Sequence, residues 1–94
     1  MENIPVDNSD ELRLDANAVA GLLMDIFGGE MTAQPTECEH CGNQAEIGTL
    51  LAFTQGPGVV LRCPACSQVI LRIVQAPKAI YLDARGAVYL KLRR

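Results

Sequence analysis

The stretch CEHCGN at residues 38–43 and its counterpart RCPACSQ at residues 62–68 carry two cysteine pairs with the same C-x2-C spacing. A C-x2-C turn directs two sulfur atoms from one tight loop toward a common point, so two such loops can supply four ligands to one tetrahedral ion. Twenty-one residues separate the pairs, close to the roughly 15 to 20 that are typical of four-thiolate zinc ribbons. The spacing therefore predicts a structural Zn²⁺ site made by Cys38, Cys41, Cys63 and Cys66.

The two predicted ligand loops differ in one respect. Gly42 directly follows the first pair and suits the positive φ angle that such a loop requires, whereas Ser67 stands in the second loop where glycine is common. The second loop therefore departs from the usual pattern without changing the ligand set. Between the loops, residues 47–62 are expected to form a hairpin that turns at residues 56–58 and returns the chain from one pair to the other.

Three other uses of the four cysteines stay open at this point. Iron in a rubredoxin-like site takes the same four thiolates, although the aromatic-rich core of that family is missing here. A thiol redox pair needs a βαβ unit beside it, and acidic, strand-rich surroundings raise a thiol pKa. Two disulfides require an oxidising compartment, and the N-terminal residues MENIPVDNSDEL have neither the basic nor the apolar segment of a secretion signal. We therefore expect zinc, and a cytoplasmic location.

Length and composition favour one small domain. The 94 residues are 49% hydrophobic but include no Trp, and a core this lean usually needs a staple such as a metal ion. The apolar runs are too short to span a membrane. Residues 1–11 contain four acidic residues without periodicity, so we expect a flexible acidic tail before a single zinc-ribbon domain at residues 12–94.

The segment LDANAVAGLLMDIFGG at residues 14–29 predicts a helix at about 15–28. Apolar residues recur there at three- and four-residue spacing, Asp15 can accept backbone hydrogen bonds as an N-cap, and Gly28 ends the pattern. Farther along, short segments rich in Val, Ile, Leu and Tyr alternate with turn residues, so the ribbon and a terminal hairpin are expected at about 36–93. Connections this short predict antiparallel strands. The expected fold is a small α+β zinc ribbon with an N-terminal helix.

The last two strand segments, residues 79–83 and 87–93, predict the terminal hairpin. A three-residue loop at 84–86 gives this hairpin two consistent faces, and Gly86 is expected to supply its left-handed residue. One face then collects Ile80, Leu82, Val88, Leu90 and Leu92, and the other collects Tyr81, Asp83, Tyr89, Lys91 and Arg93.

The charges of the chain are unevenly distributed. Residues 1–46 hold ten of the eleven acidic residues and one basic residue, whereas residues 47–94 hold one acidic and seven basic residues, so the halves carry about −9 and +6. The acidic half could simply lie against the basic sheet. Alternatively, one surface attracts an anionic partner and the other a cationic one.

Catalytic residues are not evident in the sequence. His40 is the only histidine, and its position between two ligands favours a solvent-exposed loop residue rather than a ligand or a base. Four thiolates would close the metal shell and leave no position for water. No nucleophile motif or phosphate-binding glycine loop follows a strand, and no small-molecule substrate is evident. We therefore expect a protein that is not an enzyme.

The stretches LDANAVAGLLMDIFG, CEHCG and GPGVVLRCPACSQVILRIV together resemble a family of short bacterial proteins described only as a domain of unknown function. The usual plan of that family is a leading LDGNALAG-type helix, two C-x2-C knuckles and a terminal strand pair, and the similarity covers about residues 13–90. Departures are Ala16, where glycine is commoner, and an extended acidic N-terminus. The resemblance implies a zinc-ribbon fold and a cytoplasmic location, and it implies no activity.

The leading functional hypothesis is a non-catalytic structural-zinc module, a protein-interaction or regulatory adaptor whose partner is another protein. Its candidate binding surfaces are the helix and the face formed by Tyr81, Tyr89, Lys91 and Arg93, although cross-strand packing also explains the two tyrosines. The alternative is a nucleic-acid-binding zinc ribbon, which the basic half and the aromatic residues allow. A thiol redox protein is the minor alternative.

Overall fold

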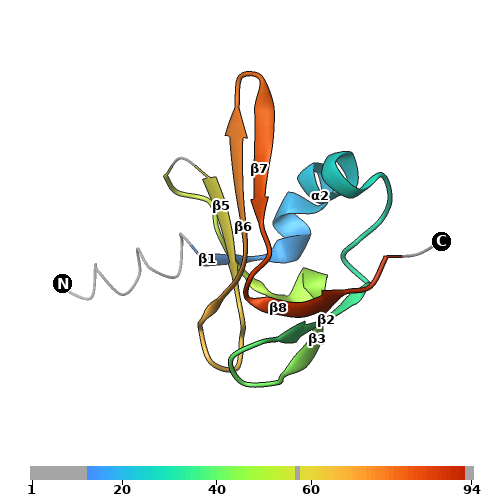
Figure 1. The fold of residues 1–94 in the computed structure, drawn as a ribbon, viewed down its shortest axis with the longest axis vertical. Coiled ribbons are helices and arrows are strands. Elements are labelled where there is room, and N and C mark those ends of the chain that lie inside the picture. The colour runs from blue at the N-terminus through green and yellow to red at the C-terminus, as the bar shows by residue number, and fades with distance from the viewer. Residues whose placement is uncertain (1–12, 57, 93–94) are drawn as a thin grey trace.

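The computed structural model describes residues 13–56 and 58–92, and it shows a small α+β fold with antiparallel sheets and one short α-helix (Figure 1). The predicted acidic tail at residues 1–11 and the candidate partner residue Arg93 lie outside the described residues. No helix in the part of the chain that is described is long and apolar enough to cross a membrane.

The elements follow the chain in an order that begins with a short strand and a helical segment. They are β1 (Arg13–Asp15), the 3-10 helix η1 (Ala16–Val19), α2 (Ala20–Phe27), β2 (Pro35–Cys38), β3 (Gln44–Glu46), the 3-10 helix η2 (Ile47–Thr49), β4 (Leu51–Phe53), β5 (Gly58–Arg62), β6 (Val69–Ala76), β7 (Ala79–Asp83) and β8 (Ala87–Leu90).

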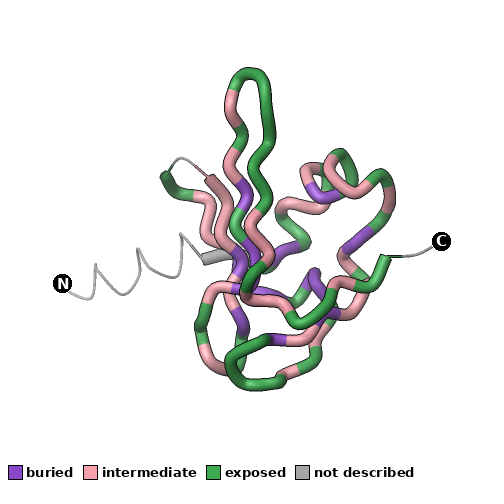
Figure 2. Tube along the Cα trace, viewed as in Figure 1, coloured by how far each residue is buried: buried purple, intermediate pink, exposed green. Residues whose placement is uncertain are grey.

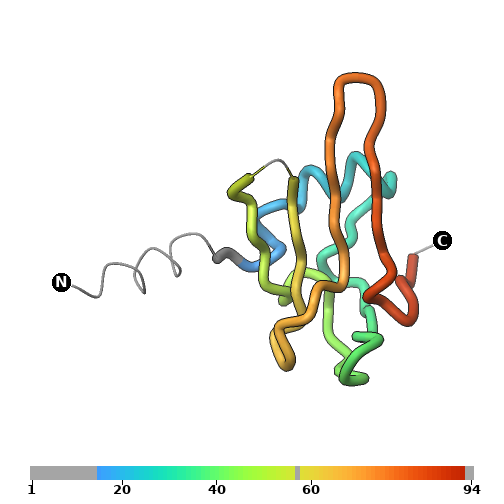
Figure 3. Tube along the Cα trace, turned by 60° about the vertical axis from the view of Figure 1, so that its left-hand side comes forward, coloured from blue at the N-terminus to red at the C-terminus, as the bar shows by residue number. Residues whose placement is uncertain are grey.

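Five strands form the larger sheet in the order β1-β4-β5-β6-β7, with every neighbour antiparallel (Figure 3). The predicted hairpin between the cysteine pairs is confirmed in part, as β4 and β5 with Phe53 opposite Val60, whereas residues 47–49 form the 3-10 helix η2 and residue 57 of the expected turn lies outside the described residues. Leu61 pairs with Leu71, and both are fully buried in the same core cluster as Leu23 of α2. The core therefore lies between the larger sheet and the helical segment, and it continues down to the cysteines. Its buried members are Ala16, Leu23, Met31, Cys38, Ile47, Leu50, Ala52, Leu61, Cys63, Ile70, Leu71 and Ile73.

The helical segment is shorter than predicted and begins differently. Residues 16–19 form a 3-10 turn before the α-helix starts, and Asp15 stands at the cap position without a side-chain hydrogen bond, so its predicted capping role is wrong. The predicted end is confirmed, because Gly28 adopts a left-handed φ of 77° there. Leu23 is fully buried, and Leu22, Ile26 and Phe27 pack against the core, so the apolar stripe faces the sheet as expected.

The smaller sheet has the order β3-β2-β8, and it overturns the predicted terminal hairpin. β7 pairs with β6 through a tight turn at residues 77–78, with Ala76 opposite Ala79, whereas β8 crosses to β2, with Thr36 opposite Leu90. Proline suits the first central position of such a turn because its φ is already fixed. The buried hydroxyl of Thr36 donates to the carbonyl of Tyr89 at 2.7 Å, so the long-range pairing satisfies a buried polar group.

Gly86 has a different role from the predicted one. Its φ is not positive, so it does not supply a left-handed loop residue. A Cβ atom at this position would lie 1.9 Å from the Val69 carbonyl oxygen and 2.6 Å from the Ile70 Cα. Glycine is therefore required because the chain between β7 and β8 passes directly against the backbone at the start of β6.

The burial pattern divides the molecule into a packed base and a projecting hairpin (Figure 2). β6 and β7 extend away from the base as a two-stranded arm (Figure 1). Four of the five β7 residues are exposed, while the strands around the cysteines contain several fully buried residues.

Candidate metal centre

The structure brings the four predicted ligands together. Cys38 is the last residue of β2 and Cys63 directly follows β5, so each pair starts where a strand ends. All four Sγ atoms lie within 4.8 Å of one another, with 3.6 Å between Cys38 and Cys66 and 3.7 Å between Cys41 and Cys63. A disulfide needs about 2.0 Å, whereas a tetrahedron with metal–sulfur distances of about 2.3 Å has edges near 3.8 Å. The cysteines are thus free thiols arranged so that they could bind a metal ion.

The two C-x2-C loops repeat one backbone pattern. In the first, the N–H of Cys38 donates to the Asn43 carbonyl at 2.9 Å and the N–H of Gly42 donates back to the Cys38 carbonyl at 2.9 Å. In the second, the corresponding bonds join Cys63 to Gln68 at 2.9 Å and Ser67 back to Cys63 at 2.8 Å. Each loop is therefore closed across its own base, which fixes the direction of both sulfur atoms.

Gly42 and Ser67 occupy equivalent positions in the two loops. Gly42 has the predicted positive φ, at 77°, and Ser67 has a φ of 67°. Ser67 is the one non-glycine residue with positive φ in the described part of the chain, and this conformation disfavours a residue with a Cβ atom. The second loop thus keeps the geometry of the first despite its unusual residue.

A strand irregularity precedes each pair. The register of β2 against β8 shifts between Glu37 and Cys38, and the register of β5 against β6 shifts between Leu61 and Arg62. Such shifts bend a strand and redirect the side chains that follow. Both strands therefore turn their ends toward the common point of the four sulfur atoms.

Arg62 supports the second loop from the side. Its Nη1 donates to the Ser67 carbonyl at 2.8 Å, and its guanidinium lies 5.7 Å from the centre of the Phe53 ring. The hydrogen bond from Arg62 therefore stabilises Ser67 in its disfavoured left-handed conformation. The only sequence signal for this role is that Arg62 directly precedes the ligand Cys63.

Gly86 connects both loops to the rest of the fold. Its carbonyl accepts a hydrogen bond from the N–H of Glu39, in the first loop, at 2.9 Å. Its Cα packs against the backbone of Val69 and Ile70, just after the second loop. The chain between β7 and β8 therefore closes the base of the metal centre, a role that the sequence did not predict.

The thiols influence one another's ionisation. Burial raises the pKa of Cys63, but the N–H groups of Cys66 and Ala65 donate to its sulfur, the latter at 3.3 Å, and together with the neighbouring thiols they bring its pKa to about 7. At Cys66 the N–H of Gln68 favours the thiolate, but burial and the other three sulfur atoms outweigh it and raise the pKa to about 12. At neutral pH Cys66 therefore keeps its proton unless a cation binds among the four sulfur atoms.

The other predicted site residues are dispersed. His40 is exposed at the tip of the first loop, as expected. Tyr81 lies in the five-stranded sheet and Tyr89 in the three-stranded sheet, so they do not share the hairpin face that was predicted. Lys91 is exposed beyond β8, and its N–H donates to the Pro35 carbonyl at 3.3 Å. Partner binding by these residues stays a prediction.

Comparison with protein-family models matches residues 8–94 to a family described as "Family of unknown function (DUF6510)". No curated protein and no solved structure gives a significant match.

Proposed function

The chain belongs to the family of unknown function DUF6510, whose description names no activity, and we propose that it is a non-catalytic zinc-ribbon module that binds another protein. The cysteine geometry supports the metal, and the distribution of exposed apolar side chains supports the partner.

The sulfur arrangement supports a structural zinc ion. Four thiolates fit the closed tetrahedral shell of structural zinc sites, and such a shell leaves no position for a water molecule to react. Iron accepts the same four-sulfur geometry, so the choice of zinc rests on the poverty of aromatic residues, two Phe and two Tyr. The ion would hold the ends of β2 and β5 together.

Metal analysis of the protein purified without added metal tests this step. We expect one zinc ion per chain, lost in Cys41→Ser and kept in Ala65→Ser, which alters an exposed residue of the second loop that is not a ligand. One iron ion per chain with thiolate-to-iron absorption would favour the rubredoxin-like alternative. A thiol that reacts at neutral pH without metal loss would favour the redox alternative.

The partner proposal rests on one observation. Seven large hydrophobic side chains are exposed among the described residues, and all except Met24 lie between residues 80 and 92. Tyr81 is the most exposed of them, at 64%. Three of the six lie on β7 in the larger sheet and three lie on β8 or just after it, and exposed apolar side chains of this kind are typical of protein interaction sites. The set in question consists of Ile80, Tyr81, Leu82, Val88, Tyr89 and Leu92.

Affinity capture with matched variants tests the partner proposal. The metal-loaded protein should retain a specific protein from lysate of its own source, Tyr81→Lys should abolish that retention, and Met24→Lys should preserve it. Met24 is the matched control because it is 47% exposed on α2. Equal retention by both variants would contradict the assignment of Tyr81 to the binding surface. Retention that nuclease treatment removes would favour the nucleic-acid alternative instead.

A further inference from the structure

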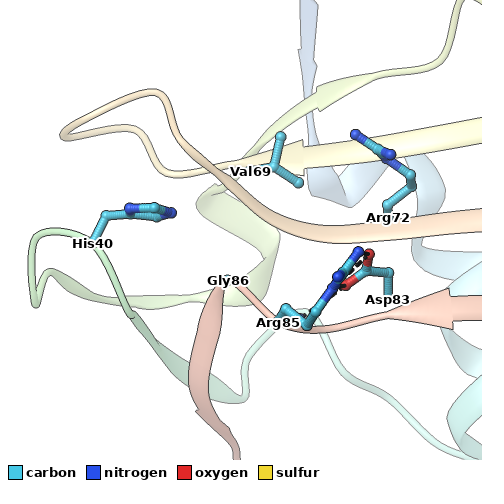
Figure 4. A pocket seen from close by; sticks show the side chains of 6 residues that line it. All are labelled: His40, Val69, Arg72, Asp83, Arg85 and Gly86. Atoms are coloured by element: carbon cyan, nitrogen blue, oxygen red, sulfur yellow. Dashed lines mark hydrogen bonds and ion pairs between the residues drawn. The ribbon is translucent and has the colours of Figure 1, made fainter.

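A pocket of about 210 Å³ lies at the junction of the first cysteine loop, the start of β6 and the chain between β7 and β8 (Figure 4). None of the four cysteines lines it. Its lining residues are His40, Val69, Arg72, Asp83, Arg85 and Gly86. At about 30 Å³ per water molecule, this volume is large enough for a small ion together with part of a group attached to it.

Hydrogen-bond donors reach the pocket from three different segments. His40 comes from the first loop, Arg72 from β6, and Arg85 from the residues after β7. In Figure 4 the imidazole of His40 extends toward the pocket from the side opposite the arginine residues. A ligand in the middle would thus be met by donors from several directions rather than from one plane.

Asp83 fixes one of the two guanidinium groups. Nη2 and Nε of Arg85 donate to the two carboxylate oxygens of Asp83 at 2.6 and 3.1 Å, and the Arg85 backbone N–H donates at 3.0 Å (Figure 4). The pairing with Arg85 lowers the pKa of Asp83 to about 2, so the carboxylate stays ionised at neutral pH. An arginine held in this way presents its remaining N–H groups in a fixed orientation.

Arg72 leaves the pocket with a net positive charge. It is directly opposite Asp83 in the β6–β7 register, on the face of the sheet away from the core. Arg85 already balances the charge of Asp83, and no described side chain accepts a hydrogen bond from Arg72. An anion is therefore the ligand that this set of groups lacks.

We propose that this basic pocket binds a phosphate group, either as the free ion or as a monoester. Two guanidinium groups and an imidazole N–H, which approach from three segments, suit the four oxygens of a tetrahedral anion better than a planar carboxylate. The proposal goes beyond the zinc module and does not depend on which protein it binds. Neighbouring thiolates oppose an anion, so we expect a modest affinity.

Titration followed by NMR tests the proposal. Sodium phosphate is added to ¹⁵N-labelled, metal-loaded protein at constant ionic strength, with acetate and O-phosphoserine as parallel arms. The backbone amides of His40, Arg85 and Gly86 should shift along saturable curves with phosphate. Tighter binding of phosphoserine would identify the monoester as the ligand, and tighter binding of phosphate the free ion.

Matched charge variants distinguish binding in the pocket from nonspecific electrostatic attraction of the anion to the protein. Arg72→Gln should weaken binding about tenfold, the loss of one charge-assisted contact, whereas Lys78→Gln should change it less than about twofold because Lys78 lies at the far tip of the hairpin. Should Arg72→Gln fold poorly, Arg85→Gln serves as the second variant, and it also leaves the Asp83 charge unbalanced. Shifts that do not saturate, equal binding of acetate, or equal losses in Lys78→Gln and Arg72→Gln would overturn the proposal.

Discussion

Replacing Gly86 with alanine adds one methyl group where the chain between β7 and β8 crosses the start of β6. The added Cβ would lie 1.9 Å from the Val69 carbonyl oxygen, and its next two neighbours, at 2.6 and 2.8 Å, are also backbone atoms. Ordinary contact begins at 3.4 Å, so the two segments must separate by about 1.5 Å. Backbone cannot rotate away as the end of a long side chain can.

The energetic cost follows from that separation. Overpacking in a close-packed region costs about 1 to 3 kcal/mol. Moving Gly86 also weakens the 2.9 Å bond that its carbonyl accepts from Glu39, which contributes about 1 kcal/mol. We therefore expect Gly86→Ala to lower the free energy of unfolding by about 2 to 4 kcal/mol, a large part of the roughly 5 to 15 kcal/mol of a typical domain.

Urea unfolding of the metal-loaded protein, followed by circular dichroism, measures this change. Gly21→Ala is the control, because Gly21 is an exposed helical position where a Cβ atom meets nothing within 4 Å. That variant should gain about 0.5 to 1 kcal/mol, since alanine favours the helix. A Gly86→Ala protein as stable as the wild type would refute the close approach on which the reasoning rests.

Four smaller experiments examine the metal centre and the core. Ser67→Gly should stabilise the protein by up to about 1 kcal/mol, because glycine adopts the left-handed backbone conformation without strain. Gly42→Ala should destabilise it by about 1 to 2 kcal/mol, because it places a Cβ atom on a residue with the same conformation. Urea unfolding curves of the two variants measure both changes. A strong chelator should abolish the strand signal in circular dichroism, because thiolate zinc sites contribute about 10 to 16 kcal/mol to folding, and a native spectrum after complete metal removal would contradict this. Metal binding holds the thiols ionised and so lowers their pKa values in the folded protein. The stabilisation is therefore present at neutral pH and is lost as the thiols are protonated on acidification. Zinc release, followed with a colorimetric indicator, should increase as the pH falls. Leu71→Ala, at a fully buried position, should cost about 2 to 5 kcal/mol, but Leu82→Ala, at a 40% exposed one, about 1 kcal/mol or less by thermal unfolding.

The metal centre was the most predictable part of the fold because its signals are local. A C-x2-C pair defines its own loop, and the positive φ of Gly42 follows from the residue type. The helix end at Gly28 and the β4–β5 hairpin are local in the same sense. In each case the decisive residues are a few positions apart, so the pattern contains all the information needed.

Partner choice between distant strands was not predictable in this way. The alternation of apolar residues in β7 and β8 fits a hairpin, and Gly86 between them suits its turn, yet β8 pairs with β2. Side-chain alternation identifies a strand but not the strand beside it. The turn residues at 77–78 favoured the observed pairing, because a tight turn there allows β7 to pair with the preceding strand, β6.

The positions of Arg72 and Arg85 also could not be predicted from the sequence, because they depend on which distant strands pair. In the sequence they are two of the seven basic residues of the second half of the chain, and nothing there places them near His40. The crossing of β8 to the smaller sheet brings the residues between β7 and β8 against the first cysteine loop, and this creates the pocket.

The pairing of β8 with β2 also sets an order of events while the chain is being made. Thr36, two residues before the first cysteine, bonds to Tyr89, 53 residues farther along the chain. A nascent chain that emerges from its N-terminus exposes all four cysteines before the strand that completes the first loop's sheet. β8 follows all four cysteines in the chain, so its pairing with β2, rather than synthesis of the last cysteine, is the step that completes the structure around the four sulfur atoms.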